Sequence, residues 1–284
     1  MALVVDDEDF AFRFDHGHHG IRRAGRPVPL RLRAASLILT LVLTAALLAG
    51  ITTAPPAEAT TGRNPVLLVH GLTADSLSWL VFKARLERDG FRVFTVDIPD
   101  RGFGDIARNS QYVAAKVDEI RRVTGAAKVD VIGHSEGGLL ARHYIKYRGG
   151  ADQVGRYISL GTPQYGTVLA NFSTVFNLAS LVGCVACYQM TTGSSFLANL
   201  NSGDDTPGPV KYTTIYTVYD ELVQPYWNAA LGNQPVTNVK IQSICPNRVV
   251  GHIGLVLDGT TYQIARAALR DQTPSWSNVN CWAL

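Results

Sequence analysis

One short segment constrains this chain more than any other, because a strand, a sharp turn and a helix meet at Ser135. The apolar run 128–132 leads into residues 133–138 (GHSEGG), and the helical stretch 139–144 follows. Gly133 and Gly137 flank the turn, where glycine tolerates the close approach of neighbouring backbone. In this setting the pattern G-x-S-x-G holds a serine hydroxyl at the end of a strand, beside a helix N-terminus. We therefore expect Ser135 to act as a nucleophile.

The rest of the chain predicts an α/β domain around this turn. Strands are expected at 66–69, 91–96, 129–132, 156–160, 211–219 and 239–244, and helices at 76–88, 109–123, 139–147 and 260–269. Strands that alternate with helices predict a mostly parallel central sheet with helices on both faces. With 284 residues and 46% hydrophobic residues, the chain is long enough for one sizeable core. A net charge of only +3 argues against a nucleic-acid partner.

The N-terminal region, residues 1–59, has the pattern of a secretory signal peptide. Arginines precede an apolar segment without charge between Arg33 and Glu58, and an A-x-A site ends at Ala59. We expect cleavage after Ala59 and export of residues 60–284 as one catalytic domain. The alternative is an uncleaved membrane anchor, since the apolar run is just long enough to span a bilayer. The long, partly acidic start also suggests translation from a point near Val28.

Four cysteines lie in the part predicted to be exported. An even number in an exported chain suggests disulfides, and four cysteines allow three pairings. We favour Cys245 with Cys281, which ties the tail to the region before His252, and a small ring of Cys184 with Cys187. No histidine lies at zinc-motif spacing from either pair, so we expect no metal and no cofactor.

A serine needs a histidine to take its proton and a carboxylate to orient that histidine. In chains with this elbow the partners follow in the order Ser, Asp or Glu, His. Two histidines follow Ser135, and His143 lies about 12 Å along the elbow helix. That leaves His252, between two glycines.

The acid must lie between Ser135 and His252. Asp220 directly follows a predicted strand, where residues of parallel sheets face a ligand. We assign Asp220 as the acid, with Glu221 as the fallback. The other candidates, Asp152, Asp204 and Asp205, lie in polar turns and are interpreted as solvated surface charges.

A tetrahedral oxyanion needs two backbone N–H donors. We expect these from Glu136, directly after the serine, and from Leu72, in the loop after the first strand. The Glu136 side chain is interpreted as a solvated carboxylate at the helix N-terminus in preference to a catalytic group. His70 is expected to shape the oxyanion loop, and His134 to pack beneath the elbow.

These residues resemble the α/β-hydrolase serine lipases. His70-Gly71-Leu72 with GHSEGG resembles the bacterial class 2 lipases, and segments 166–169, 191–194 and 219–225 (YDELVQP) resemble the fungal lipase B type. The resemblance implies the α/β-hydrolase fold and Asp220 as the triad acid. It also implies a disulfide from Cys245 to Cys281. It departs at Leu72, where the fungal type has a hydroxyl-bearing residue, and at Glu136, where it has glutamine. These departures bear on efficiency and pH optimum, and not on reaction class.

The sequence thus predicts a secreted serine carboxylester hydrolase, foremost a triacylglycerol lipase, that acts as a monomer on a lipid or other ester. Alternatives are a polyester or cutin-type hydrolase, an acyltransferase, or a secreted binding protein without catalysis. Residues 168–200 are unusually apolar. They are interpreted either as core or as a lid or acyl-pocket wall suited to a lipid–water interface.

Overall fold

The computed structural model describes residues 62–168, 183–233 and 235–284, which belong to one compact unit, Ala59–Leu284. Its centre is a sheet of six strands in the order β2-β1-β3-β4-β5-β6, and every neighbouring pair is parallel. The strands are β1 (Val66–Val69), β2 (Val93–Val96), β3 (Val129–His134), β4 (Val154–Leu160), β5 (Lys211–Tyr216) and β6 (Val236–Lys240). The predicted parallel sheet is confirmed.

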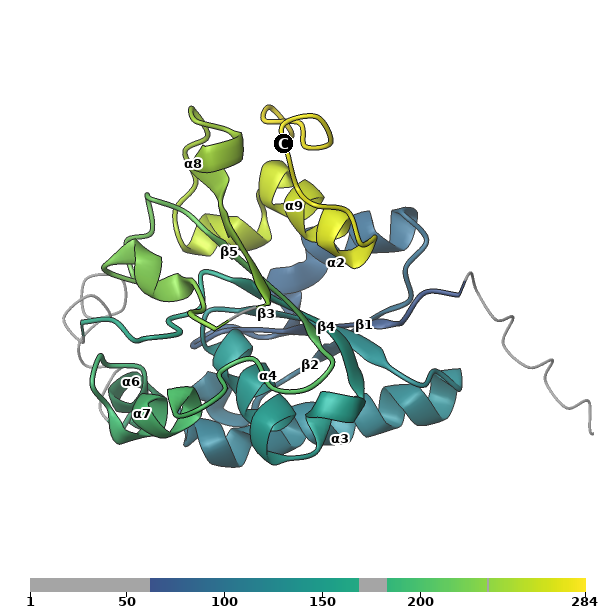
Figure 1. The fold of residues 1–284 in the computed structure, drawn as a ribbon. Coiled ribbons are helices and arrows are strands. Elements are labelled where there is room, and N and C mark those ends of the chain that lie inside the picture. Colours follow the sequence, from purple (N-terminus) through teal and green to yellow (C-terminus); the bar gives the residue numbers. More distant parts are fainter. Residues whose placement is uncertain (1–61, 169–182, 234) are drawn as a thin grey trace, which may run out of the picture. The chain divides into compact units, whose positions relative to one another are not determined.

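Helices follow most of these strands. The α-helices are α2 (Leu80–Arg88), α3 (Ile106–Thr124), α4 (Glu136–Tyr147), α6 (Val185–Gln189), α7 (Ser195–Asn201), α8 (Ile241–Ile244) and α9 (Gly259–Leu269). Short 3₁₀ helices form η1 (Ser76–Trp79), η2 (Pro99–Gly102), η3 (Gly150–Asp152), η5 (Tyr226–Ala229) and η6 (Ile253–Val256). Helices α3 and α4 cover one face of the sheet, and α2 and α9 cover the other (Figure 1).

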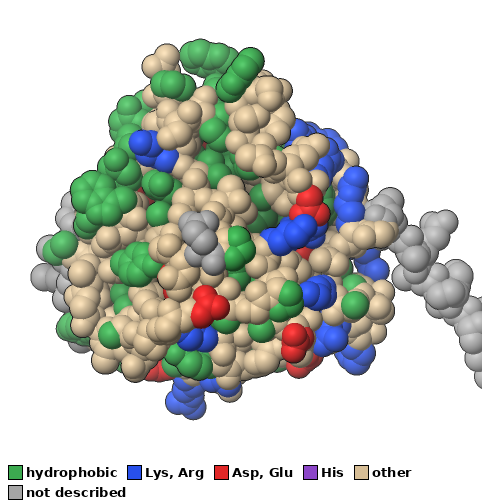
Figure 2. Space-filling model, in the orientation of Figure 1, with side chains coloured by type: hydrophobic (Ala, Val, Ile, Leu, Met, Phe, Trp, Pro, Cys, Tyr) green, Lys and Arg blue, Asp and Glu red, His purple; other side chains and the backbone are tan. Residues whose placement is uncertain are grey.

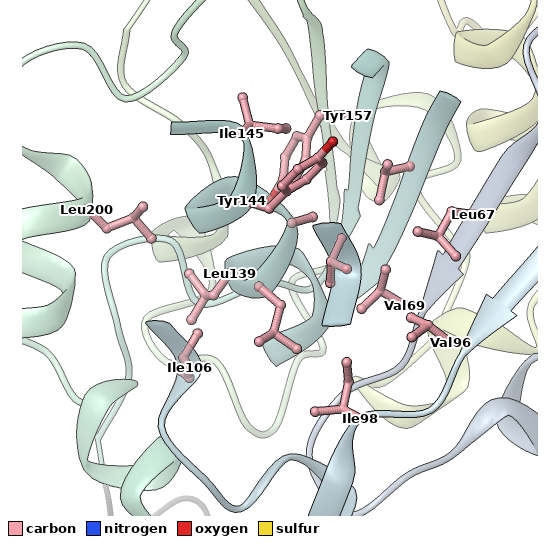
Figure 3. Packing of buried hydrophobic residues seen from close by; sticks show 14 of the residues in the cluster. Leu67, Val69, Val96, Ile98, Ile106, Leu139, Tyr144, Ile145, Tyr157 and Leu200 are labelled. Atoms are coloured by element: carbon pink, nitrogen blue, oxygen red, sulfur yellow. The ribbon is translucent and has the colours of Figure 1, made fainter. Parts of the chain in front are cut away.

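The core consists of two apolar layers, one on each face of the sheet. Side chains alternate along a strand, so Leu67 and Val69 of β1 enter one layer while Val66 and Leu68 enter the other. Figure 3 shows part of the first layer, where side chains from the strands and from α3, α4 and α7 fill the space between them. Both faces of the central strands are therefore dry, which leaves the strand ends as the place for chemistry.

The last predicted strand has the wrong bounds. The sequence predicts a strand over 239–244, but β6 pairs with β5 over Val236–Lys240, and residues 241–244 form the helical turn α8. Strand β5 ends at Tyr216, opposite Lys240, so the later residues have no strand to pair with. The helical turn satisfies their backbone groups instead, and Cys245 N–H donates to the Ile241 carbonyl at 2.8 Å.

The structure forms both favoured disulfides, Cys184–Cys187 and Cys245–Cys281. The signal peptide predicted within residues 1–59 lies outside the described residues, as do residues 169–182 of the apolar stretch 168–200 that is interpreted as core or as a lid. Among the described helices, none is both long and apolar enough to span a bilayer.

Hydrophobic and basic side chains are distributed unevenly over the surface. On the face in Figure 2, hydrophobic side chains gather mainly at the upper left, while Lys and Arg gather mainly at the right, where β1 begins in Figure 1. Large hydrophobic side chains are exposed in the loops and short 3₁₀ helices between the strands and the next α-helices or strands, namely Leu77, Val168, Tyr219, Trp227, Ile253 and Leu257. The carboxyl ends of the strands thus combine open loops with apolar surface.

Candidate active site

The turn between β3 and α4 holds Ser135 in a backbone conformation that only a tight elbow requires. Its φ is 54° and its ψ is −125°, an unusual combination for a residue with a side chain. A Cβ at Gly133 would lie 2.5 Å from the Gly138 nitrogen, and one at Gly137 would lie 2.2 Å from the Val69 carbonyl oxygen. At both flanking positions a side chain would collide with neighbouring backbone, so the turn in this form needs glycine there.

Asp220 and His252 form a buried pair from two loops. His252 Nδ1 lies 2.9 Å from Asp220 Oδ2 and 3.0 Å from Oδ1, and both residues are 1% exposed. Asp220 Oδ1 also accepts hydrogen bonds from the backbone N–H groups of Leu222 and Val223, at 3.0 and 2.7 Å. These donors stabilise a charged carboxylate, which in turn fixes the imidazole ring and its tautomer.

Two further side chains hold the backbone of His252. Glu221 Oε2 accepts a hydrogen bond from the His252 backbone N–H at 2.8 Å. A Cβ at Gly251 would lie 2.5 Å from the same oxygen, so the glycine makes room for the carboxylate. His134 Nε2 lies 3.0 Å from the His252 carbonyl oxygen, to which it donates. Burial and the neighbouring His252 lower the pKa of His134 to about 3, so this ring is neutral.

The loop after β1 passes directly over the serine. A Cβ at Gly71 would lie 2.9 Å from Ser135 Cβ, which places the next residue, Leu72, beside the elbow. His70 fixes this loop, because its Nδ1 lies 2.8 Å from the Gly71 carbonyl oxygen and its Nε2 accepts from Ile98 N–H at 2.9 Å. Burial lowers the pKa of His70, in keeping with a neutral, structural ring.

Ser135 and His252 line one cavity of about 110 Å³. Most of its wall is apolar, and the lining residues are Leu72, Thr73, Ala74, Ser78, His134, Leu222, Ile253 and Val256 in addition to these two. His252 Nε2 is buried and has no hydrogen-bond partner among the described residues. A ring nitrogen in this state can receive a proton from a hydroxyl in the same cavity.

The interpretation of Glu136 as a solvated carboxylate is wrong. Its backbone opens α4, where the first N–H groups have no partner within the helix. Its side chain is 0% exposed, and both carboxyl oxygens are buried without a hydrogen-bond partner among the described residues. Burial raises the pKa of this carboxyl well above its ordinary value.

The structure separates the remaining acid candidates from this pair. The interpretation of Asp205 as a solvated surface charge is wrong, because this residue is buried. The Tyr165 hydroxyl and the Gly232 backbone N–H donate hydrogen bonds to its carboxylate. Asp152 lies in η3, before β4 begins, and Asp204 is exposed. The fallback acid Glu221 contacts the backbone of His252 and makes no hydrogen bond to its ring within the described residues. In the same residues, no cluster of three or more His, Cys, Asp or Glu side chains could hold a metal ion.

Sequence reasoning missed the contacts that Glu221 and His134 make with the backbone of His252. A local signal for the first exists, since Gly251 directly precedes the histidine and leaves space beside it. No local signal exists for the contact of His134, because residues 134 and 252 lie far apart in the sequence and only the fold brings them together.

Comparisons with known proteins bear on the fold and the family. Residues 64–179 match the family described as alpha/beta hydrolase fold. Lipase B of Pseudozyma antarctica is 27% identical over 74% of this chain and 63% of its own length. A triacylglycerol lipase of Vibrio cholerae is 30% identical over 50% of this chain and 46% of its own length. The chain therefore spans less than two thirds of either relative.

Solved structures give the same result. The crystal structure of Aspergillus fumigatus lipase B matches with a TM-score of 0.65 and 25% identity, over 78% of this chain and 56% of that one. The mature form of a Bacillus licheniformis lipase matches with a TM-score of 0.58 and 24% identity, over 75% of this chain and 94% of that one, a likeness of fold. This chain therefore has the α/β-hydrolase fold and is similar to fungal lipase B and to bacterial triacylglycerol lipases.

Proposed function

We propose that this chain is a secreted serine carboxylester hydrolase, most specifically a triacylglycerol lipase. The observation that carries the proposal is the buried Asp220–His252 pair, whose histidine lines the same cavity as the serine of a strained elbow. The similar proteins, named lipase B and triacylglycerol lipase, support the same reaction class.

The proposed reaction proceeds through an acyl-enzyme. His252 Nε2 takes the proton from the Ser135 hydroxyl as Oγ attacks the ester carbonyl, and Asp220 stabilises the imidazolium that forms. The oxyanion of the tetrahedral intermediate accepts hydrogen bonds from the backbone N–H groups of Leu72 and Glu136. His252 then gives its proton to the leaving alcohol. Water, activated by the same ring, hydrolyses the acyl-enzyme and restores Ser135.

The surroundings favour an apolar acyl or alcohol group. The cavity wall carries Leu72, Leu222 and Val256, and Ile253 both lines the cavity and is 51% exposed. Leu77, in η1 after the oxyanion loop, is 66% exposed. Apolar surface that continues from a cavity to the outside suits a substrate presented at a lipid–water interface.

Export is proposed from two features. Residues 1–59 have the signal-peptide pattern, and all four cysteines are paired in disulfides, which persist in oxidising compartments. We propose cleavage after Ala59 and action as a monomer. N-terminal sequencing of the exported protein tests the cleavage site.

A labelling experiment with a chain-length series tests the function. We expect a p-nitrophenyl alkylphosphonate to modify the purified protein at one site per molecule, and Ser135→Ala to remain unmodified. Triglycerides and p-nitrophenyl esters of increasing acyl length then separate lipase from esterase. Hydrolysis of a polyester film without triglyceride hydrolysis would favour the cutin-type alternative. Transfer of the acyl group to an added alcohol in preference to water would favour an acyltransferase. If the folded protein were not labelled, this result would contradict the proposal that the chain is a serine hydrolase.

A further inference from the structure

Among the described residues, Glu136 has a fully buried carboxyl group with no hydrogen-bond partner on either oxygen. It lies in the first turn of α4, and a Cβ at Gly102 of η2 would lie 2.2 Å from Glu136 Oε2. Gly102 has a φ of +86°, so glycine is needed there for both the backbone conformation and the space. The carboxyl group therefore packs directly beneath the backbone of η2.

That same backbone holds the oxyanion loop. The Arg101 carbonyl oxygen accepts a hydrogen bond from Thr73 N–H at 2.8 Å, and Thr73 directly follows Leu72. Thr73 has a φ of 66° and Arg101 a φ of 51°, so both ends of this bond have positive φ. The bond joins η2 to the loop that passes over Ser135. A continuous set of contacts thus connects the Glu136 carboxyl, Gly102, Arg101, Thr73 and Leu72.

We propose that Glu136 is a positioning residue of the oxyanion hole, whose carboxylic acid group remains uncharged and supports the η2 backbone that holds the Leu72 loop. The proposal deepens the proposed function and rests on it. Glu136 would then serve both donors, since its own N–H is one of them and its side chain fixes the other. In this account the buried carboxyl group has no charge, and a neutral acid is far less costly to bury without hydrogen-bond partners than a carboxylate.

The charged groups on the surrounding elements do not pair with this carboxyl. On η2, the Arg101 side chain is 67% exposed and lies 3.9 Å from Asp75, and Asp100 is exposed. At the end of β1, His70 is engaged by Gly71 and Ile98. On α4, the Arg142 guanidinium donates to Gln164 and Asn201. Burial alone accounts for the raised pKa of Glu136.

An alkaline limit on turnover follows. When Glu136 ionises, an unpaired charge must either remain in a dry site or draw water beneath Gly102. Water that enters beneath Gly102 would displace η2 and, with it, the Leu72 loop. Substrate binding changes less than the chemical step, because the oxyanion contacts strengthen in the transition state.

The first experiment measures folding and does not depend on activity. We compare urea unfolding of the wild type and of Glu136→Gln from pH 5 to pH 8. Over this range the unfolded chain, with an ordinary glutamate pKa of about 4.3, has lost a proton that the proposal requires the folded wild type to keep. The wild type should therefore lose stability relative to Glu136→Gln as pH rises. The expected change is about tenfold in the unfolding equilibrium constant per pH unit, about 1.4 kcal/mol.

A matched control is Glu119→Gln, which removes an exposed carboxylate on α3. We expect its stability difference from the wild type to stay flat from pH 5 to pH 8. A flat difference for Glu136→Gln as well would show that Glu136 is ionised in the folded protein and would overturn the proposal. Carbon-13 labelling of the glutamate carboxyls gives the same answer without any variant, because one resonance should keep the shift of the protonated form at pH 7.

The second experiment links the group to catalysis. We measure kcat and KM on a soluble p-nitrophenyl ester at pH 7.0 and pH 9.5 for the wild type, Glu136→Gln, Glu136→Ala and Glu119→Gln. The wild type and Glu119→Gln should lose kcat at the higher pH with little change in KM, while Glu136→Gln should retain most of its own pH 7.0 value. Glu136→Ala should have a lower kcat than Glu136→Gln at both pH values.

The outcomes separate the two proposals. An identical alkaline loss of kcat in the wild type and Glu136→Gln would overturn the positioning role while leaving the ester hydrolase intact. A wild type without any esterase activity would instead contradict the proposed function. The folding measurement would still report whether Glu136 is neutral.

Discussion

Two buried carboxyl groups lie on opposite sides of Ser135, and the protein treats them differently. Asp220, in the loop after β5, is 1% exposed and accepts hydrogen bonds from two backbone N–H groups and from the ring of His252. Glu136, at the start of α4, is 0% exposed, and no donor reaches it among the described residues. The two carboxyl groups are thus equally buried and differ in the hydrogen-bond donors that reach them, and such donors favour the charged form of a carboxyl.

The two regions also differ in the disulfide that cross-links each of them. On the His252 side, Cys245 precedes the histidine in the chain, and its disulfide to Cys281 joins positions 36 residues apart. The Glu136 side lies near Cys184–Cys187, which joins positions three residues apart, and Ala186 N–H inside that ring donates to Phe103, the residue after Gly102. Each half of the site therefore has its own cross-link, a long loop on one side and a minimal one on the other.

The largest effect should come from Asp220→Asn. Its amide would present N–H groups to His252 Nδ1 and favour the wrong ring tautomer, so we expect kcat to fall by about 10⁴-fold. Circular dichroism should show an unchanged fold, since the side chain keeps its shape. Activity within tenfold of the wild type would mean that the charged carboxyl is not needed, and the contrast with Glu136 would then fail.

Removing the disulfides should affect stability to different extents. The chain-entropy model gives about 4 kcal/mol for the Cys245→Ser/Cys281→Ser double variant and about 2 kcal/mol for Cys184→Ser/Cys187→Ser, because the second loop is so short. Urea unfolding under non-reducing conditions measures both. Equal losses would show that native contacts around the small ring, such as Ala186 with Phe103, matter as much as loop length.

The packing of Glu136 against η2 can be tested with an added methyl group. Gly102→Ala introduces both a strained positive φ and a contact with Glu136, and we expect a loss of about 3 kcal/mol. Gly125→Ala is the matched control, because Gly125 has a φ of +70° and open space around its missing Cβ. It should lose only about 1 kcal/mol.

We attribute the larger loss of stability in Gly102→Ala than in Gly125→Ala to the contact with Glu136. In a Glu136→Ala background, Gly102→Ala should therefore cost about as much as Gly125→Ala does, which a double-mutant cycle measures. If the costs of the two mutations simply add, the carboxyl does not press on η2, and the support that it gives to the oxyanion loop is refuted.

These two regions also mark how far the sequence alone predicts the site. The elbow was predictable because its signals are local, with glycines fixed by the turn around Ser135 and chain order selecting Asp220 and His252. The burial of Glu136 depends on Gly102, which a distant loop brings onto α4, and no local pattern reports it. The same holds for the end of β6, where apolar residues that suit a strand form α8 because β5 offers no further partner.

The smallest effect concerns Glu221, which separates holding a backbone from orienting a ring. Glu221→Gln keeps an oxygen that can accept from the His252 backbone N–H, whereas Glu221→Ala removes it and leaves that buried donor without a partner. We expect kcat to fall about tenfold in the alanine variant, equivalent to about 1.4 kcal/mol, and much less in the glutamine variant.

Steady-state kinetics of the two Glu221 variants decide between two roles. If Glu221 were the triad acid, its charge would be essential, and glutamine would be as damaging as alanine, with losses near those of Asp220→Asn. Recovery by glutamine therefore assigns the charge requirement to Asp220 alone. It would leave the site with three carboxyl groups in three roles, since Asp220 needs its charge, Glu221 needs only an acceptor oxygen, and Glu136 must stay protonated.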